Sequence, residues 1–188
     1  MIGALPTSLD INGKAFAIRT DFRDVLTIIE AFGDPELESE EKMFVCLYVL
    51  YKNFEGIKPD DYEEAYTKAV WFIDCGSDPK QTDRPKPRLM DWQQDEQILF
   101  PAIKNVAGFE TRARKYIHWW TFMGYFMEIH DGVFSQVLAL RQKKAKRKKL
   151  EKWEQEFWSA NKDMCVLQTR LSEEEQKAKD RLNALLNN

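Results

Sequence analysis

Apolar residues recur at intervals of three or four along most of this 188-residue chain. The clearest case is residues 20–35, "TDFRDVLTIIEAFGDP", where one helix would carry the apolar side chains of Phe22, Val25, Leu26, Ile28, Ile29 and Phe32. Thr20 is a candidate helix cap, and Gly33 followed by Pro35 is typical of a helix end. Because similar spacing returns in several later segments, the chain is expected to be mainly α, as a helical bundle.

Two more helices are predicted before residue 77. The first, residues 39–54, opens with Ser39 and acidic residues, and its middle is apolar nearly all round, so we expect it to be buried. The second begins after Pro59 and ends at Gly76.

Residues 76–90 are rich in proline and basic residues, which predicts an exposed loop. A helix follows, with Asp91 as a candidate cap and Gly108 as its end. Pro101 either lies inside this helix or separates two shorter ones.

The N-terminal segment "SLDINGKAFAIR" predicts a small β-hairpin. Asn12-Gly13 is a strong hairpin signal because both central residues of a type I′ turn need a positive φ. On either side of it apolar residues alternate with others, so each strand can turn one face to a core. These apolar residues are Leu9, Ile11, Phe16 and Ile18.

The aromatic segment "RKYIHWWTFMGYFMEIHDG", residues 114–132, predicts a helix at the centre of the bundle. Its wide apolar face contributes Trp119, Trp120 and Phe126 to the predicted core. A narrow polar stripe, counted from Arg114 at helical spacing, contains His118, which we therefore expect at a surface or partner contact. Neighbouring turns offer His118 no Cys, Asp or Glu partner, so the segment does not predict a catalytic or metal site.

A basic run, "RQKKAKRKK", spans residues 141–149. It could be a solvated helix face, a contact for a protein partner or a nucleic-acid site, although acidic residues follow it directly and no aromatic residue interrupts it. A helix through the run would advance about 15 Å without burying a large side chain.

An apolar stripe returns after the run. It would pack on the same body after a bend, on a second copy of the chain, or on another protein. We therefore expect a core domain at residues 1–140 and a basic helix with a long C-terminal helical arm at residues 141–188, the last turns being weakly anchored. The stripe consists of Leu150, Trp153, Phe157, Ala160 and Met164.

Composition and motifs do not favour an enzyme. The formal net charge is only −3, and the chain has no Gly-rich phosphate loop and no useful Cys/His pair. The three cysteines are far apart, which is typical of reduced thiols in a cytosol and not of a disulfide framework or zinc site. We expect no catalytic residues, no cofactor, no metal and no membrane span.

Three sequence segments together resemble a family of small bacteriophage tail-gene proteins, the gene-product-fifteen family of long-tailed phages that infect Gram-positive bacteria. The segments contain Thr20-Asp21-Phe22-Arg23, Asp91-Trp92 with Asp95, and His118-Trp119-Trp120. The resemblance covers about residues 5–167, and the segment from Leu171 onward has no counterpart in it.

The resemblance implies a tail assembly chaperone in the host cell cytoplasm that is absent from the mature virion. Its partner would be the tape measure protein, with the major tail tube protein and a second copy of the chain as further candidates. Nucleic acid is not the expected partner; a nucleic-acid module using residues 141–149 and a structural tail component retained in the virion are the alternatives. The candidate partner-binding residues are Leu150, Trp153, Phe157 and Met164, with Lys146, Arg147, Lys148 and Lys149.

Overall fold

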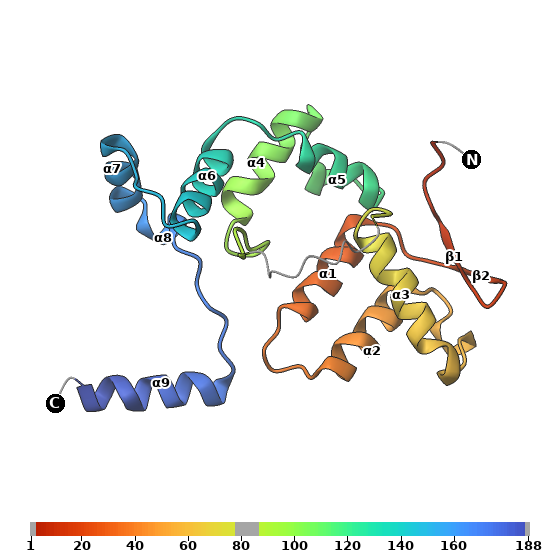
Figure 1. The fold of residues 1–188 in the computed structure, drawn as a ribbon. Helices are drawn as coiled ribbons and strands as arrows, with labels where there is room; N and C mark the ends of the chain where they lie inside the picture. The colour runs from red at the N-terminus through yellow and green to blue at the C-terminus, as the bar shows by residue number, and fades with distance from the viewer. Residues whose placement is uncertain (1–2, 78–86, 187–188) are drawn as a thin grey trace. The chain divides into compact units, whose positions relative to one another are not determined.

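A computed structural model of the chain describes residues 3–77 and 87–186, with the side chain of Leu186 left out. The expected exposed loop at residues 76–90 therefore lies mostly outside the described residues. As predicted, the fold is mainly α with one small antiparallel hairpin (Figure 1). The elements are β1 (Ser8–Ile11), β2 (Lys14–Ala17), α1 (Phe22–Phe32), α2 (Ser39–Leu50), α3 (Tyr62–Ile73), α4 (Glu96–Ala107), α5 (Trp119–Met127), α6 (Val133–Ala145), α7 (Lys152–Ala160), α8 (Lys162–Cys165) and α9 (Glu173–Leu186), with short 3-10 turns η1 (Phe54–Gly56), η2 (Pro59–Asp61) and η3 (Thr111–Ala113).

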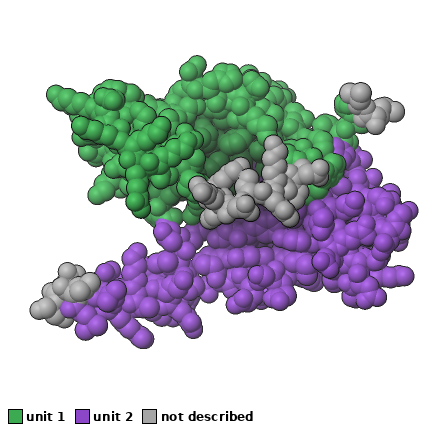
Figure 2. All heavy atoms as spheres, viewed as in Figure 1, with its two compact units in different colours: residues 1–5, 20–22, 71–168 green, residues 6–19, 23–70, 169–188 purple. Residues whose placement is uncertain are grey.

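Packing divides the described chain into two units, coloured in Figure 2. Unit 1 contains residues 1–5, 20–22 and 71–168, and unit 2 contains residues 6–19, 23–70 and 169–188. This division differs from the expected boundary at residue 140, because residues 141–168 belong to the same unit as α4 and α5.

The N-terminal hairpin of unit 2 has the predicted register. Leu9 pairs with Phe16 across the strands, and Asn12 and Gly13 both have positive φ, at 50° and 76°. A type I′ turn requires these values, and they match the right-handed twist of the flanking strands. Leu9 and Phe16 are buried as expected, together with Ile11 and Ile18.

The rest of the unit 2 core forms where Tyr51 meets the hairpin and α3. The Tyr51 ring meets Phe16 edge-on at 6.4 Å, and its hydroxyl donates to the carbonyl of Ala65. Arg19 donates through Nη1 to the carbonyl of Val49, which is one of the carbonyls that the end of α2 leaves unpaired. These contacts join the end of α2 to α3 and to the hairpin.

Helices α1 and α4 follow the sequence patterns closely but begin at different residues from those expected. Helix α1 begins at Phe22, so Asp21 and not Thr20 precedes it, and the Thr20 hydroxyl bonds instead to Tyr116 Oη. Helix α4 begins at Glu96 and continues through Pro101 to a left-handed Gly108. Asp91 caps the turn before α4 by accepting from the backbone of two following residues, Gln93 and Gln94.

Helix α5 is shorter than the predicted helix and begins at Trp119. The expectation that His118 lies on an exposed helical stripe is wrong, because His118 is buried and is the N-cap of α5. Its Nδ1 accepts a hydrogen bond from the backbone N–H of Trp120 at 3.1 Å. An imidazole acceptor serves here as Ser or Asp would, by satisfying an N–H that the first helical turn leaves unpaired.

Trp119 and Trp120 secure the end of α3. Their indole N–H groups donate to the carbonyls of Ile73 and Phe72, at 2.8 and 2.9 Å. The last carbonyls of a helix lack intrahelical donors, so two adjacent tryptophans satisfy two of them at once. Trp119 is buried, whereas Trp120 and Phe126 are half-buried.

Candidate functional site

The basic run is divided by a sharp turn at the end of α6. Arg147 has a φ of +53°, its N–H donates to the carbonyl of Lys144, and the N–H of Lys148 donates to the carbonyl of Lys143. This pair of bonds is a Schellman motif, which usually has glycine at the left-handed position. The chain therefore reverses at Arg147 and does not continue as one long helix.

The turn exposes the four cations of residues 146–149, which we call the basic turn. Four residues after Lys149, Trp153 of α7 has 56% of its surface exposed. A shallow hollow of about 360 Å³ adjoins the basic turn, and its lining includes Lys144, Lys148, Lys149 and Trp158. Four exposed cations and an exposed indole thus lie within eight consecutive residues of unit 1, 146–153.

The remaining predicted partner-binding residues face the inside of unit 1. Leu150 is buried in a cluster with Val137, Leu140 and Cys165, so the expectation that it contacts a partner is wrong. Phe157 and Met164 are half-buried against the same cluster. Of the three packing alternatives for this stripe, Leu150, Phe157 and Met164 adopt the one in which it packs on the same body after a bend, whereas Trp153 of the same stripe is exposed.

Helix α7 is fixed at its start by two glutamates. Glu151 and Glu154 form a capping box, in which the Glu154 carboxylate accepts from the backbone N–H of Glu151. Glu154 is buried and also pairs with Lys143 of α6. Hydrogen bonds from Lys143 and from that backbone N–H lower the pKa of Glu154 below its usual range. One cation of the basic run, Lys143, is therefore paired with a buried glutamate.

Arg141, the first residue of the basic run, is not available to a partner because its side chain is buried. Its guanidinium is buried and forms a two-point ion pair with Asp95, with both N–O distances at 2.7 Å. It also donates to the backbone carbonyl of Leu89, before α4, and to those of Met164 and Cys165, at the end of α8. This ion pair connects α6 to the start of α4 and to α8.

The segments that carried the family resemblance meet inside unit 1. The N–H of Trp119 donates to the carbonyl of Thr20, and the N–H of Phe22 donates to the carbonyl of Ile117. The Phe22 ring stacks on Phe122 at 4.3 Å. These residues form a buried junction held by backbone hydrogen bonds and stacked rings. Packing of the core therefore accounts for the residues found at these positions.

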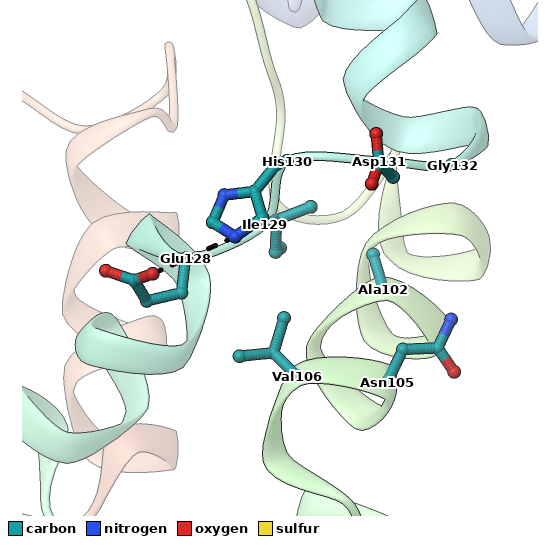
Figure 3. Close-up of a pocket in the computed structure, with 8 residues that line it drawn as sticks. All are labelled: Ala102, Asn105, Val106, Glu128, Ile129, His130, Asp131 and Gly132. Atoms are coloured by element: carbon teal, nitrogen blue, oxygen red, sulfur yellow. Dashed lines mark ion pairs between the residues drawn. The ribbon is translucent and has the colours of Figure 1, made fainter.

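A second hollow, of about 520 Å³, lies between α4 and the segment after α5 (Figure 3). Val106 of α4 faces this segment, where the exposed Glu128 and His130 side chains point toward one another, with 3.9 Å between Oε2 and Nε2.

Among residues 3–77 and 87–186, no three His, Cys, Asp or Glu side chains are grouped to hold a metal ion. Within the same ranges, every helix is too short or too polar to cross a membrane.

The expectation that the apolar middle of segment 39–54 is buried is wrong for one face of α2. Phe44 and Tyr48, one turn apart on α2, are 51% and 61% exposed. An apolar pattern without a polar face predicts burial on all sides, so it could not indicate which side was left open. No motif in the sequence marked these two residues.

Comparison with protein families decides what kind of protein this is. The family model described as Bacteriophage Gp15 protein matches residues 1–167. The chain belongs to this bacteriophage family. No match was found among curated proteins or among solved structures. The region matched by the Gp15 model ends before α9, whose described side chains are all exposed.

Proposed function

We propose that this Gp15 family protein is a tail assembly chaperone that binds the tape measure protein and keeps it soluble until the tail tube encloses it. The supporting observation is the exposed Trp153 beside the basic turn in a bacteriophage protein. A tape measure helix exposes its apolar stripe until the tube forms, and a protein with exposed apolar side chains can cover that stripe.

The binding would combine two contributions of different kinds. Trp153 would supply apolar contact, because tryptophan is among the residues that most often dominate interface energies. The basic turn would meet acidic side chains of the partner, which mainly accelerates association and depends on salt. Trp153 would therefore set the lifetime of the complex and the cations its ionic-strength dependence.

Co-expression with the phage's own tape measure protein tests the proposal. The wild-type chain should keep the tape measure in the soluble fraction, and Trp153→Asp should reduce that fraction at least tenfold. Met127→Asp is the matched control, because Met127 is a similarly exposed apolar residue of unit 1. Reversing Lys146, Lys148 and Lys149 to glutamate should weaken capture at low salt and have little effect at high salt.

Two results would reject the proposal. A tape measure protein that stays insoluble with the wild-type chain present removes the chaperone function. If the chain at the same time binds phage DNA in a strongly salt-dependent way through residues 141–149, the nucleic-acid alternative replaces it. Recovery of the chain from purified virions would instead favour a structural tail component.

A further inference from the structure

Unit 2 has an aromatic face that the proposed function does not use. We define it by four residues, Phe44 and Tyr48 of α2, Phe54 of η1 and Tyr62 of α3. The rings form a continuous chain of contacts, with centroid distances of 5.3 Å between Phe44 and Phe54 and 5.4 Å between Phe54 and Tyr62. Phe54 and Tyr62 are half-buried, whereas the first two rings are mostly exposed.

The aromatic face is held in place before any partner arrives. Phe44 stacks on Tyr48 at 6.0 Å with an angle of 12° between the rings, and Phe54 meets both rings edge-on. Rings that are already ordered lose little conformational entropy on binding. Exposed tyrosine and phenylalanine in contact with one another, unlike single exposed apolar residues, are typical of an interaction surface.

The surroundings of the aromatic face are acidic. Residues 38–64, which carry all four rings, contain eight acidic residues and three lysines, a formal charge of −5. Glu40 and Glu41 lie one turn before Phe44 on α2, Glu55 follows Phe54, and all three are exposed. A partner for this surface therefore needs apolar side chains flanked by positive charge.

The geometry also indicates that the partner is a helix. The backbone groups of α2 are used within the helix, so the surface offers side chains and no open strand edge. The 6.0 Å between the Phe44 and Tyr48 rings is close to the spacing of side chains one turn apart on a partner helix. We infer that the aromatic face binds an amphipathic helix whose apolar stripe is flanked by lysine or arginine. That this helix belongs to the tape measure protein rests on the proposed function.

Synthetic peptides test the surface without reference to the tape measure. The probes are two helical peptides of roughly 18 residues, long enough to form a helix, with leucine at helical spacing and with either lysine or glutamate on the flanks. The peptides are compared on a chain in which Lys146, Lys148 and Lys149 are changed to alanine and Trp153 to serine, because the basic turn and Trp153 would otherwise offer the glutamate peptide a site. The lysine peptide should bind this chain at least tenfold more tightly than the glutamate peptide, by fluorescence anisotropy. Phe44→Ser with Tyr48→Ser should weaken lysine-peptide binding at least tenfold, whereas Met127→Ser, at an exposed apolar residue of unit 1, should leave it unchanged.

A second variant keeps the test informative if the double serine variant does not fold. Glu55→Lys changes one exposed charge beside Phe54 and should weaken the lysine peptide and strengthen the glutamate peptide. Equal binding of the two peptides to the chain without the basic-turn surface, or lysine-peptide binding that neither variant changes, would overturn the inference.

Co-expression with the tape measure protein then identifies the partner. If the wild-type chain does not solubilise the tape measure, the proposed function fails, and the peptide result still decides whether the aromatic face binds basic helices. If the wild-type chain and a folded Phe44→Ser/Tyr48→Ser variant solubilise it equally well, the aromatic face is not the tape measure site and this part of the inference is wrong.

Discussion

Replacing Asp95 with alanine should destabilise unit 1 strongly. Two hydrogen bonds, each with an N–O distance of 2.7 Å, join Arg141 to Asp95. Only 1% of the Asp95 side chain and 4% of the Arg141 side chain are exposed. Asp95→Ala leaves the guanidinium buried with carbonyl acceptors but without an opposite charge. Breaking a buried ion pair in this way typically costs about 3–5 kcal/mol. The free energy of unfolding of an ordinary domain is roughly 5–15 kcal/mol, so the variant should be close to unfolding at 37 °C.

Tryptophan fluorescence is a suitable assay, because all six tryptophans lie between residues 71 and 158, inside unit 1. Urea unfolding should shift to a lower midpoint in Asp95→Ala with little change in slope. Asp95→Ala combined with Arg141→Met removes the stranded charge and should recover at least about 1 kcal/mol relative to the single variant.

Glu110→Ala is the matched control for this prediction. Glu110 also pairs with an arginine, Arg112, but on the surface, where water screens the interaction. Hydrogen bonds from Arg112 lower the pKa of Glu110 to about 2, yet we expect only a small change in the unfolding midpoint. A loss below about 1 kcal/mol in Asp95→Ala, or one no larger than in Glu110→Ala, would refute the reasoning.

Three further predictions follow from the packing. Trp119→Ala should cost about 3–5 kcal/mol in urea unfolding, and Trp120→Ala clearly less, because the second ring is only half-buried; equal losses would contradict this. Arg147→Gly should stabilise unit 1 by roughly 0.5–1 kcal/mol, because glycine adopts a φ of +53° without strain, and an unchanged or lower midpoint would count against the Schellman turn. Burial raises the pKa of the Cys46 and Cys75 thiols to about 12 and about 11, so at pH 8 iodoacetamide should label both slowly until urea unfolds the chain; labelling of the native protein at the unfolded rate would disprove it.

The hairpin and the first helix could be predicted from the sequence because their signals are local. Asn12-Gly13 meets the conformational requirement of its own turn, and the α1 pattern ends where Gly33 stops it. Chain reversals also leave local signals when glycine occupies them, as Gly108 does after α4. Arg147 makes the same kind of turn without glycine, so no local signal marks this turn and the residue pattern favours a long arm.

The ion pair and the aromatic face could not be predicted, because both depend on residues far apart in the chain. In the sequence Arg141 belongs to the basic run, and nothing local distinguishes a buried arginine from an exposed one. Only its position opposite Asp95, 46 residues earlier, separates it from its neighbours. Similarly, Phe44 and Tyr48 have the apolar character of a core, and their exposure depends on which side of α2 the hairpin and α3 cover.

The two exposed surfaces have opposite charge, and this restricts the partner more than either surface does alone. Under the two proposals, the basic turn with Trp153 would bind an apolar segment beside acidic residues, and the aromatic face would bind one beside basic residues. A partner that engages both on one chain must therefore carry apolar stripes with alternating charge blocks. Binding at one surface would raise the local concentration of the other site on the same partner, so each contact can be weak while the pair is strong. Salt should weaken both contacts together, whereas removal of one surface should leave the other contact with its own, lower affinity.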